Sequence, residues 1–155
     1  MTYQQTLDFL YNLLPVFQHV GGSAYKAGFD NIVALEEALG NPHRKIRSVH
    51  VAGTNGKGSV SHMVASTLTA AGYRTGLFTS PHLKDFRERI RIDGRMISEE
   101  EVIGFVERNR GTIDRVQPSF FEITTAIAFD CFARHEVDVA VVEVGMGGRL
   151  DSTNI

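Results

Sequence analysis

The amino-acid sequence predicts an α/β fold of three layers, in which helices cover both faces of a mostly parallel sheet. First, short β-branched runs alternate with longer segments of helical periodicity along the 155 residues. Second, the run from Val137 to Val144 is almost continuously apolar, which is typical of a strand buried on both faces. Third, residues 46–71 read as a strand, a glycine-rich loop and a helix in direct succession. Because no linker separates these segments, we expect a single domain.

Three helices are expected from the spacing of apolar residues. Residues 7–14, 32–39 and 60–71 carry apolar side chains at helical intervals. Each run ends at a proline or a glycine, which are common stop signals. These helices would supply the layers on the faces of the sheet.

Two further helices are expected from their start signals. Ser98 is followed three residues later by Glu101, and Ser119 by Glu122, which are the residues of a capping box. The second of these boxes opens an apolar helix that continues through residues 123–132.

The strands are expected at residues 46–52, 75–79 and 137–144, where β-branched and other apolar residues gather. Isoleucines also flank Asp93 and Gly94, a pair that favours the tight turn of a hairpin. The sequence therefore predicts parallel strands joined by helices, with one hairpin.

Composition places the chain among ordinary globular proteins. Hydrophobic residues make up 43% and charged residues 22%, and a net charge of −2 offers no basic field for nucleic acid. No apolar run approaches the roughly 18 residues that span a bilayer, and the first residues lack the pattern of a secretory signal. Cys131 is the single cysteine, and we interpret it as a core residue rather than a nucleophile. We expect a cytoplasmic protein that binds neither nucleic acid nor membranes.

A glycine-rich loop between strand and helix is the main functional signal. Glycines let backbone N–H groups converge on phosphate oxygens, and the helix N-terminus adds partial positive charge. The alternative is a glycine-rich turn that only caps the helix, but Lys57 at the helix start would oppose the dipole. We favour a P-loop NTPase-like phosphate site made by Thr54, Asn55, Gly56, Lys57, Gly58 and Ser59.

This loop departs from the usual pattern Gly-x-x-x-x-Gly-Lys-[Ser/Thr] at two positions. Val51 stands where that pattern has its first glycine, and Gly58 stands where it has the hydroxyl residue that binds Mg²⁺. The loop is thus a shortened variant, and magnesium ligands must come from elsewhere.

Ser80 and Glu143 are the candidate magnesium ligands, with Ser59 as an alternative. Ser80 follows an expected strand at the edge where open α/β sheets bind ligands. Glu143 ends an otherwise apolar strand, where a carboxylate is costly to bury unless it meets a cation. Two structural alternatives stay open: Glu143 paired with Arg149, and Ser80 as a residue that only ends its strand.

The glycine-rich segment 145–151 is not a dinucleotide-binding fingerprint. Leu150 stands where that fingerprint needs its third glycine, and no helical pattern follows. Spacing alone therefore assigns this segment no cofactor.

Several motifs in this order resemble the folylpolyglutamate and dihydrofolate synthases, which are ligases of the Mur type. The shorter ones that fit this family are Glu88-Arg89-Ile90 and Phe121-Glu122. The three main ones are the loop from Gly53 to Ser59, the stretch Thr79-Ser80-Pro81-His82-Leu83, and the segment from Glu143 to Asn154. The resemblance covers nearly the whole chain.

The resemblance implies an ATP-dependent ligase that adds L-glutamate to dihydropteroate or folates through an acyl phosphate. By family position, Lys57 would be catalytic, residues 54–59 would hold ATP, and Ser80 and Glu143 would ligate Mg²⁺. From the residues alone, Phe120 and Phe121 would be interpreted as packing at a helix start. The pterin or folate pocket would be lined by Ser119, Phe120, Phe121, Glu122, Leu150, Asp151, Ser152, Tyr25, Lys26 and Ala27.

The resemblance also implies that the chain is a fragment. Family members are longer and carry a further metal-binding histidine, a modified lysine and a C-terminal domain. We therefore expect residues 1–155 to be the N-terminal part of a Mur-ligase-type ATP-binding domain, inactive alone and monomeric at full length. Dihydrofolate synthase and folylpolyglutamate synthase activity fit these residues equally. A P-loop small-molecule kinase and a nucleotide-binding module without catalysis are the alternatives.

Overall fold

A five-stranded sheet with the order β1-β5-β2-β3-β4 forms the centre of the molecule. The computed structural model describes residues 1–13 and 28–155, and expectations for residues 14–27 lie outside this part. β5 lies between β1 and β2 and pairs in parallel with both. The strands are β1 (Ser48–Val51), β2 (Thr75–Phe78), β3 (Ile90–Ile92), β4 (Arg95–Met96) and β5 (Val139–Glu143).

The sheet is mixed, because a hairpin extends its parallel part. β3 runs antiparallel to β2, and β4 runs antiparallel to β3. Asp93 and Gly94 form the turn between β3 and β4 with φ of 48° and 78°, the positive values that a type I′ turn requires. The predicted hairpin is therefore confirmed, and the parallel strands β1, β5 and β2 lie beside it.

The described helices begin largely where the sequence predicted. Ser98 caps α5 and Ser119 caps α6, each within a complete capping box that satisfies otherwise unpaired N–H groups. Thr2 and Gln5 form another box at α1, a start signal that was not among those predicted. None of the described helices is long and apolar enough to cross a membrane. The helices are α1 (Tyr3–Asn12), α3 (Asp30–Ala38), α4 (Lys57–Ala70), α5 (Glu99–Val116) and α6 (Phe120–Arg134), with 3₁₀ helices η2 (Pro42–Lys45) and η3 (Phe86–Arg89).

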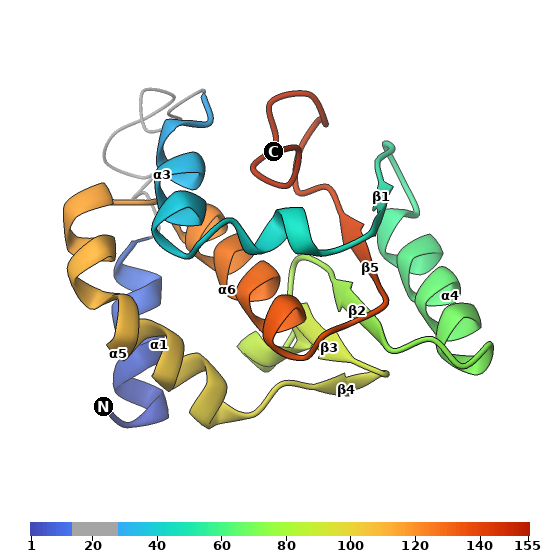
Figure 1. The fold of residues 1–155 in the computed structure, drawn as a ribbon, viewed down its shortest axis with the longest axis horizontal. Helices are drawn as coiled ribbons and strands as arrows, with labels where there is room; N and C mark the ends of the chain where they lie inside the picture. Colours follow the sequence, from blue (N-terminus) through green and yellow to red (C-terminus); the bar gives the residue numbers. More distant parts are fainter. Residues whose placement is uncertain (14–27) are drawn as a thin grey trace.

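Helices cover both faces of the sheet and complete the three predicted layers (Figure 1). α4 covers one face, where its Ala65 packs with Leu77 of β2 and Val141 of β5. α6 covers the other face, where its Phe132 belongs to the larger core together with Val142 of β5. Because Val141 and Val142 point to opposite faces, β5 is buried on both sides, and this explains its apolar sequence.

Gly76 of β2 marks a close approach between the sheet and α6. A Cβ atom at this position would lie 2.7 Å from Cδ1 and Cε1 of Phe132. We expect Gly76→Ala to lower the free energy of unfolding by about 1–3 kcal/mol, because added volume in a packed core forces its neighbours to shift. Unfolding in urea measures the change.

Gly111→Ala is the matched control for this substitution. Gly111 lies within α5, and a Cβ atom there would meet nothing within 4 Å. We expect this variant to raise the free energy of unfolding by about 0.5–1 kcal/mol, because alanine loses less backbone entropy in a helix than glycine. An unchanged stability of Gly76→Ala would contradict the packing of Phe132 on β2.

Candidate functional site

The predicted phosphate loop joins the end of β1 to the start of α4. α4 begins at Lys57, so Lys57, Gly58 and Ser59 form its first turn. Gly56 precedes the helix with a φ of 81°, a left-handed conformation that glycine adopts without strain. No described side chain caps α4, in contrast to α5 and α6, which leaves its first N–H groups available to an anion.

The side chain of Lys57 folds back over this loop. Its Nζ donates a hydrogen bond to the carbonyl oxygen of Gly53 at 2.9 Å. The ammonium group therefore lies beside the positive end of α4, where an anion bound between them would interact favourably with both. Thr54, Asn55 and Gly56 are exposed. The geometry suits a phosphate group, and the role of these residues stays a prediction.

Glu143 and Ser80 are neighbours at the carboxyl end of the parallel strands. Glu143 ends β5 and is 4% exposed, and its Oε2 accepts a 2.8 Å hydrogen bond from the backbone N–H of Ser80. The two residues meet because β5 and β2 are adjacent parallel strands. The other carboxylate oxygen, Oε1, lies 3.6 Å from the position of a Cβ atom on Gly58.

The donor atoms at this point fit a magnesium ion. A carboxylate and a hydroxyl are hard oxygen ligands of the kind that Mg²⁺ prefers. Glu143 also faces Gly58, the helix position that lacks the usual hydroxyl group. Arg149 is exposed and forms no salt bridge in the described part of the chain, so the Glu143–Arg149 ion pair considered above is wrong. Magnesium binding by Ser80 and Glu143 stays a prediction.

One cavity of about 760 Å³ joins the predicted phosphate, metal and pterin sites. Lys57, Ser80 and Glu143 all line it. The predicted pterin residues that line it are Ser119, Phe120, Phe121, Glu122, Leu150, Asp151 and Ser152. The predicted nucleotide residues outside the described lining are Thr54, Asn55, Gly56, Gly58 and Ser59. Tyr25, Lys26 and Ala27 lie outside the described residues.

The start of α6 supplies an aromatic wall to this cavity. Phe120 is buried and Phe121 is half-buried, and both line the cavity. Phe121 packs over Gly145 so closely that a Cβ atom there would collide with the ring. Its ring centre lies 6.0 Å from that of Phe78 in β2. Such a wall suits a flat aromatic ligand.

The polar residues at the start of α6 are already engaged. Glu122 accepts a 2.6 Å hydrogen bond from the N–H of Ser119, whose side chain in turn caps the helix. Asn31 of α3 also donates to Glu122, at 3.4 Å. Ser119 and Glu122 therefore shape the cavity through their capping bonds.

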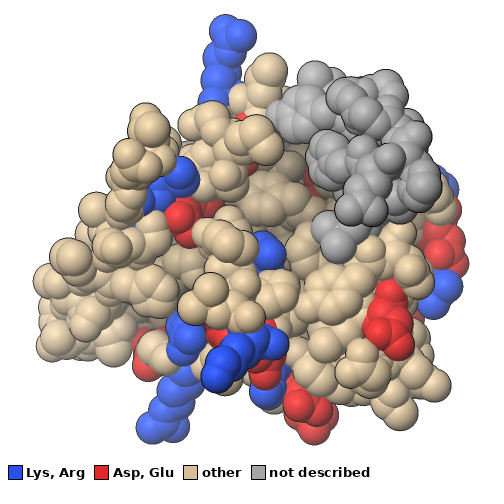
Figure 2. Space-filling view, turned by 180° about the vertical axis from the view of Figure 1, so that it is seen from behind, with Lys and Arg blue, Asp and Glu red and all other residues tan. Residues whose placement is uncertain are grey.

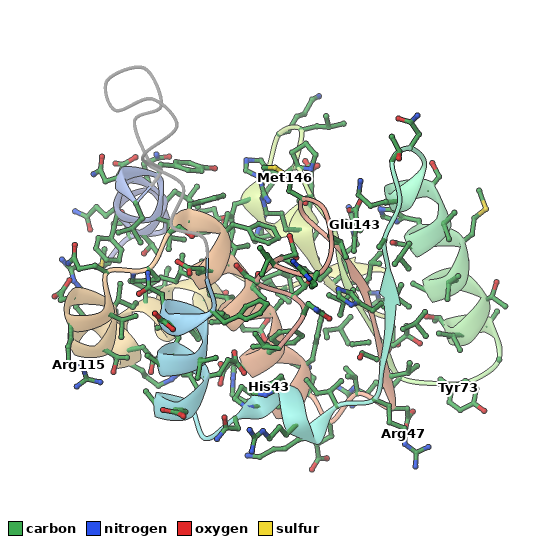
Figure 3. The ribbon with its side chains drawn as sticks, turned by 90° about the horizontal axis from the view of Figure 1, so that it is seen from above. His43, Arg47, Tyr73, Arg115, Glu143 and Met146 are labelled. Carbon is green, nitrogen blue, oxygen red and sulfur yellow. The ribbon has the colours of Figure 1, made fainter. Side chains whose placement is uncertain are left out.

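Asp151 holds the loop that follows β5. The residue is 5% exposed, and its carboxylate accepts hydrogen bonds from the N–H of Met146, at 2.8 Å, and from the N–H and hydroxyl of Thr153. His50 of β1 contacts the same Thr153 hydroxyl at 2.7 Å. Figure 3 shows Met146 and Glu143 near one another at this end of the sheet. The loop is thus tied back to β1, with Leu150 and Ser152 on the cavity side.

Cys131 is a core residue, as the sequence indicated. It is fully buried in α6, and burial raises the pKa of its thiol to about 12. Its Sγ lies 3.7 Å from Oε1 of Glu101, which also contacts His135 at 2.5 Å. The ligand atoms of these three residues lie within 4.8 Å of one another, but their mutual contacts account for them without a metal ion.

Comparison with known proteins identifies the relatives of this chain. No family model matches it. A dihydrofolate synthase/folylpolyglutamate synthase of Bacillus subtilis is 45% identical over 137 residues, which cover 84% of this chain and 32% of the relative. The crystal structure of a folylpolyglutamate synthase from Thermotoga maritima matches with a TM-score of 0.88 and 44% identity, over 98% of this chain and 35% of that chain. The chain matches an N-terminal portion of the folylpolyglutamate and dihydrofolate synthases.

The structure of a folylpolyglutamate synthase in complex with AMPPCP and folate also matches this chain. Its TM-score is 0.88 at 38% identity, over 100% of this chain and 38% of that chain. The α/β fold class predicted from the sequence is confirmed by these synthases. The chain spans about a third of the length of these three relatives, at 32%, 35% and 38%.

The cavity also contains residues that neither the spacing nor the likeness to the synthases had singled out as site residues. Arg89 is the one charged residue among them. It belongs to the Glu88-Arg89-Ile90 motif, but a motif does not show that its arginine is buried in a cavity. The additional described residues are Asn12, Leu13, Gly28, Asn31, Pro81, Arg89, Gln117, Pro118, Gly145 and Met146.

Glu88 holds the segment that follows Ser80. Its carboxylate accepts hydrogen bonds from the N–H groups of Leu83 and Lys84 at 2.9 Å and of Asp85 at 2.8 Å. These backbone bonds lower the pKa of Glu88 from 4.5 to about 2. The ionised carboxylate therefore fixes the turn after the expected magnesium ligand.

We expect the wild-type protein to be more stable than Glu88→Gln at neutral pH and to lose this advantage in acid. Because the carboxyl group has a lower pKa when folded, its contribution is complete above the ordinary value of 4.5 and is lost as the pH falls towards about 2. The glutamine side chain does not titrate. Urea unfolding of both proteins across this range measures the difference, and a difference independent of pH would contradict the assignment.

Proposed function

We propose that the full-length protein carrying this chain joins L-glutamate to dihydropteroate or a folate, with conversion of ATP to ADP and phosphate. The observation that supports this function best is the single cavity that contains Lys57, Ser80 and Glu143 together with the aromatic wall at Phe120 and Phe121. The likeness to folylpolyglutamate and dihydrofolate synthases supports the same reaction class.

The proposed chemistry has two steps. An oxygen of the acceptor carboxylate attacks the γ-phosphorus of ATP, and ADP leaves, which produces an acyl phosphate. The amine of glutamate then attacks the acyl carbon, phosphate leaves, and the nitrogen loses a proton as the amide forms. The first step converts a poor leaving group into a good one.

Three sets of residues in this chain would take part in the first step. Lys57 and the first N–H groups of α4 would bind the phosphates and neutralise charge on the transferring group. Ser80 and Glu143 would hold Mg²⁺, which supplies electrostatic stabilisation of the phosphoryl group when bound. Phe120 and Phe121 would pack against the pterin or benzoyl ring.

We further propose that residues 1–155 are the N-terminal part of the ATP-binding domain. This chain covers 32% to 38% of the relatives, which are therefore about three times as long. The glutamate site would then be completed by the remainder of such a longer protein. We also propose a monomer acting in the cytoplasm, whose reducing conditions suit the free thiol of Cys131.

The test incubates the full-length protein with ATP, Mg²⁺, dihydropteroate and L-glutamate, and measures ADP and the glutamylated product by mass spectrometry. We expect both products to depend on glutamate and on the acceptor. Residues 1–155 alone should form neither product. ADP formation with a phosphorylated hydroxyl compound and no need for glutamate would indicate a kinase. Nucleotide binding without any product would indicate a binding module.

A further inference from the structure

Arg89 places a buried positive charge in the cavity. It is the last residue of η3, is 8% exposed and lines the cavity beside Phe120. Its Nε donates a 2.7 Å hydrogen bond to Nδ1 of His82, and its guanidinium carbon lies 5.1 Å from the centre of the Phe120 ring. These two contacts orient the guanidinium plane.

Arg89 forms no salt bridge within the described residues, whereas arginines nearer the surface do. Figure 2 shows cationic and anionic side chains interspersed on one face of the molecule. The paired arginines are Arg87 with Asp85 and Glu99, Arg108 and Arg134 with Asp130, and Arg110 with Asp114. Residues 14–27 contain no Asp or Glu, so that segment has no carboxylate to offer.

The carboxylates of the same cavity are bound by other groups. Glu122 accepts from the N–H of Ser119, and Glu143 accepts from the N–H of Ser80. The third, Asp151, accepts from N–H groups of its own loop. Glu88, which precedes Arg89 in the chain, holds three backbone N–H groups. Within residues 1–155, Arg89 therefore has no carboxylate partner, and its charge is available to an anionic ligand in the cavity.

The charge of Arg89 persists despite its burial. Burial lowers the pKa of its guanidinium, and the nearby Tyr11 opposes this shift. An arginine nevertheless stays protonated in proteins. A buried charge without a partner is unfavourable, and a bound anion would relieve this. Because Nε is taken by His82, the outer nitrogens Nη1 and Nη2 are the ones left to bind it.

His82 keeps the guanidinium in this orientation. Since arginine only donates, Nδ1 of His82 is the acceptor, and Nε2 carries the proton and donates to the hydroxyl of Tyr11 at 3.2 Å. Burial, followed by the charge of Arg89, lowers the pKa of His82, which favours this neutral ring. Tyr11, His82 and Arg89 thus form one chain of hydrogen bonds.

We propose that Arg89 binds the carboxylate of the acceptor substrate with its outer nitrogens. This proposal rests on the ligase function proposed above, because it names the residue that receives the dihydropteroate or folate acid. A planar guanidinium matches the two oxygens of a carboxylate. Phe120 beside it offers an apolar surface to the aromatic ring of the same substrate.

A phosphate of ATP is the less suitable anion for this site. The phosphate groups have Lys57 and the start of α4, a helix that covers the face of the sheet opposite α6. Arg89 instead contacts Phe120 of α6 and His82, on the side of the predicted pterin wall. The side chains of Lys57 and Arg89 therefore reach the cavity from different layers of the fold.

The test compares the binding of pteroate and of its neutral carboxamide to the full-length protein. We expect the wild type to bind pteroate about tenfold to a hundredfold more tightly than the carboxamide, as for a hydrogen bond to a charged group. Arg89→Met should bind the two compounds within about threefold of each other, and Arg89→Lys should show an intermediate preference because a point charge lacks the fork. The affinity for AMPPCP should stay the same in all three proteins.

Arg87→Met is the matched control, because Arg87 lies in the same 3₁₀ helix but is paired with Asp85. It should retain the full preference for pteroate. Thermal unfolding checks that each variant is folded. If Arg89→Met does not fold, the comparison of Arg89→Lys with the wild type provides the test.

The possible results separate this proposal from the function on which it rests. Equal weakening of both compounds by Arg89→Met, or a preference that survives it, would overturn the assignment. Weaker AMPPCP binding with unchanged pteroate preference would assign Arg89 to phosphate instead. A wild-type protein that ligates glutamate yet binds both compounds equally would refute the role of Arg89 alone. A wild-type protein that forms no glutamylated product would refute the ligase function and the assignment with it.

Discussion

Replacement of Lys57 by alanine is expected to reduce glutamate-dependent ADP formation by roughly a thousandfold in the full-length protein, as for the loss of a preorganised charge at a transferring phosphoryl group. Lys57 folds back over the predicted phosphate loop and lines the cavity, and under the proposed function its ammonium group would meet the transferring phosphoryl group. The loss should fall on turnover, because the interaction strengthens as charge develops in the transition state. Steady-state kinetics with saturating dihydropteroate and glutamate measure it.

Lys45→Ala is the control for this variant. Lys45 ends η2, is exposed and does not line the cavity. Its replacement should leave turnover unchanged, and Lys57→Ala should keep its affinity for the acceptor substrate. Normal turnover in Lys57→Ala would show that the loop does not serve phosphoryl transfer.

Glu143→Gln is expected to lower turnover by roughly a hundredfold to a thousandfold and to raise the Mg²⁺ concentration needed for half-maximal rate. The substitution removes the buried negative charge but keeps an oxygen that can accept the hydrogen bond from the N–H of Ser80. The turn at Ser80 should therefore stay in place. Titration of the reaction rate with Mg²⁺ separates a lost metal ligand from a displaced loop, because only the former changes the metal dependence.

Glu37→Gln provides the comparison, since Glu37 is an exposed carboxylate of α3. It should behave as the wild type at every Mg²⁺ concentration. If Glu143→Gln also kept the wild-type rate and metal dependence, the carboxylate would have only a structural role, and the proposed magnesium site would have to be abandoned.

Features that depend on residues close along the chain could be predicted from the sequence. The capping boxes of α5 and α6 each need two residues three positions apart, and the turn at Asp93 and Gly94 needs two adjacent residues. The apolar run of β5 predicted burial on both faces, and Glu143 stood out as the charge at its end. The predicted phosphate loop could also be recognised from the sequence, because its glycines and Lys57 lie close together along the chain.

Boundaries and exposure depended more on the neighbours of each element. The strand expected at residues 46–52 is shorter, Ser48–Val51, and lies at the edge of the sheet with mostly exposed side chains. Valines indicate a strand, but they do not show how many partners it has. Asp151 was predicted to line the pterin pocket; it lines the cavity, and its carboxylate mainly holds the N–H groups of its own loop.

The sequence by itself determined the elements and the residue types of the site, whereas the tertiary structure decided which of them meet. The parallel pairing of β5 with β2 places Glu143 against Ser80, which lies 63 residues away in the chain. Arg89 is buried because it packs against His82 and against Phe120 of α6, at the wall of a cavity in which it has no carboxylate partner. Contacts of this kind join distant segments through strand order and packing, and the local periodicity of a sequence does not encode them.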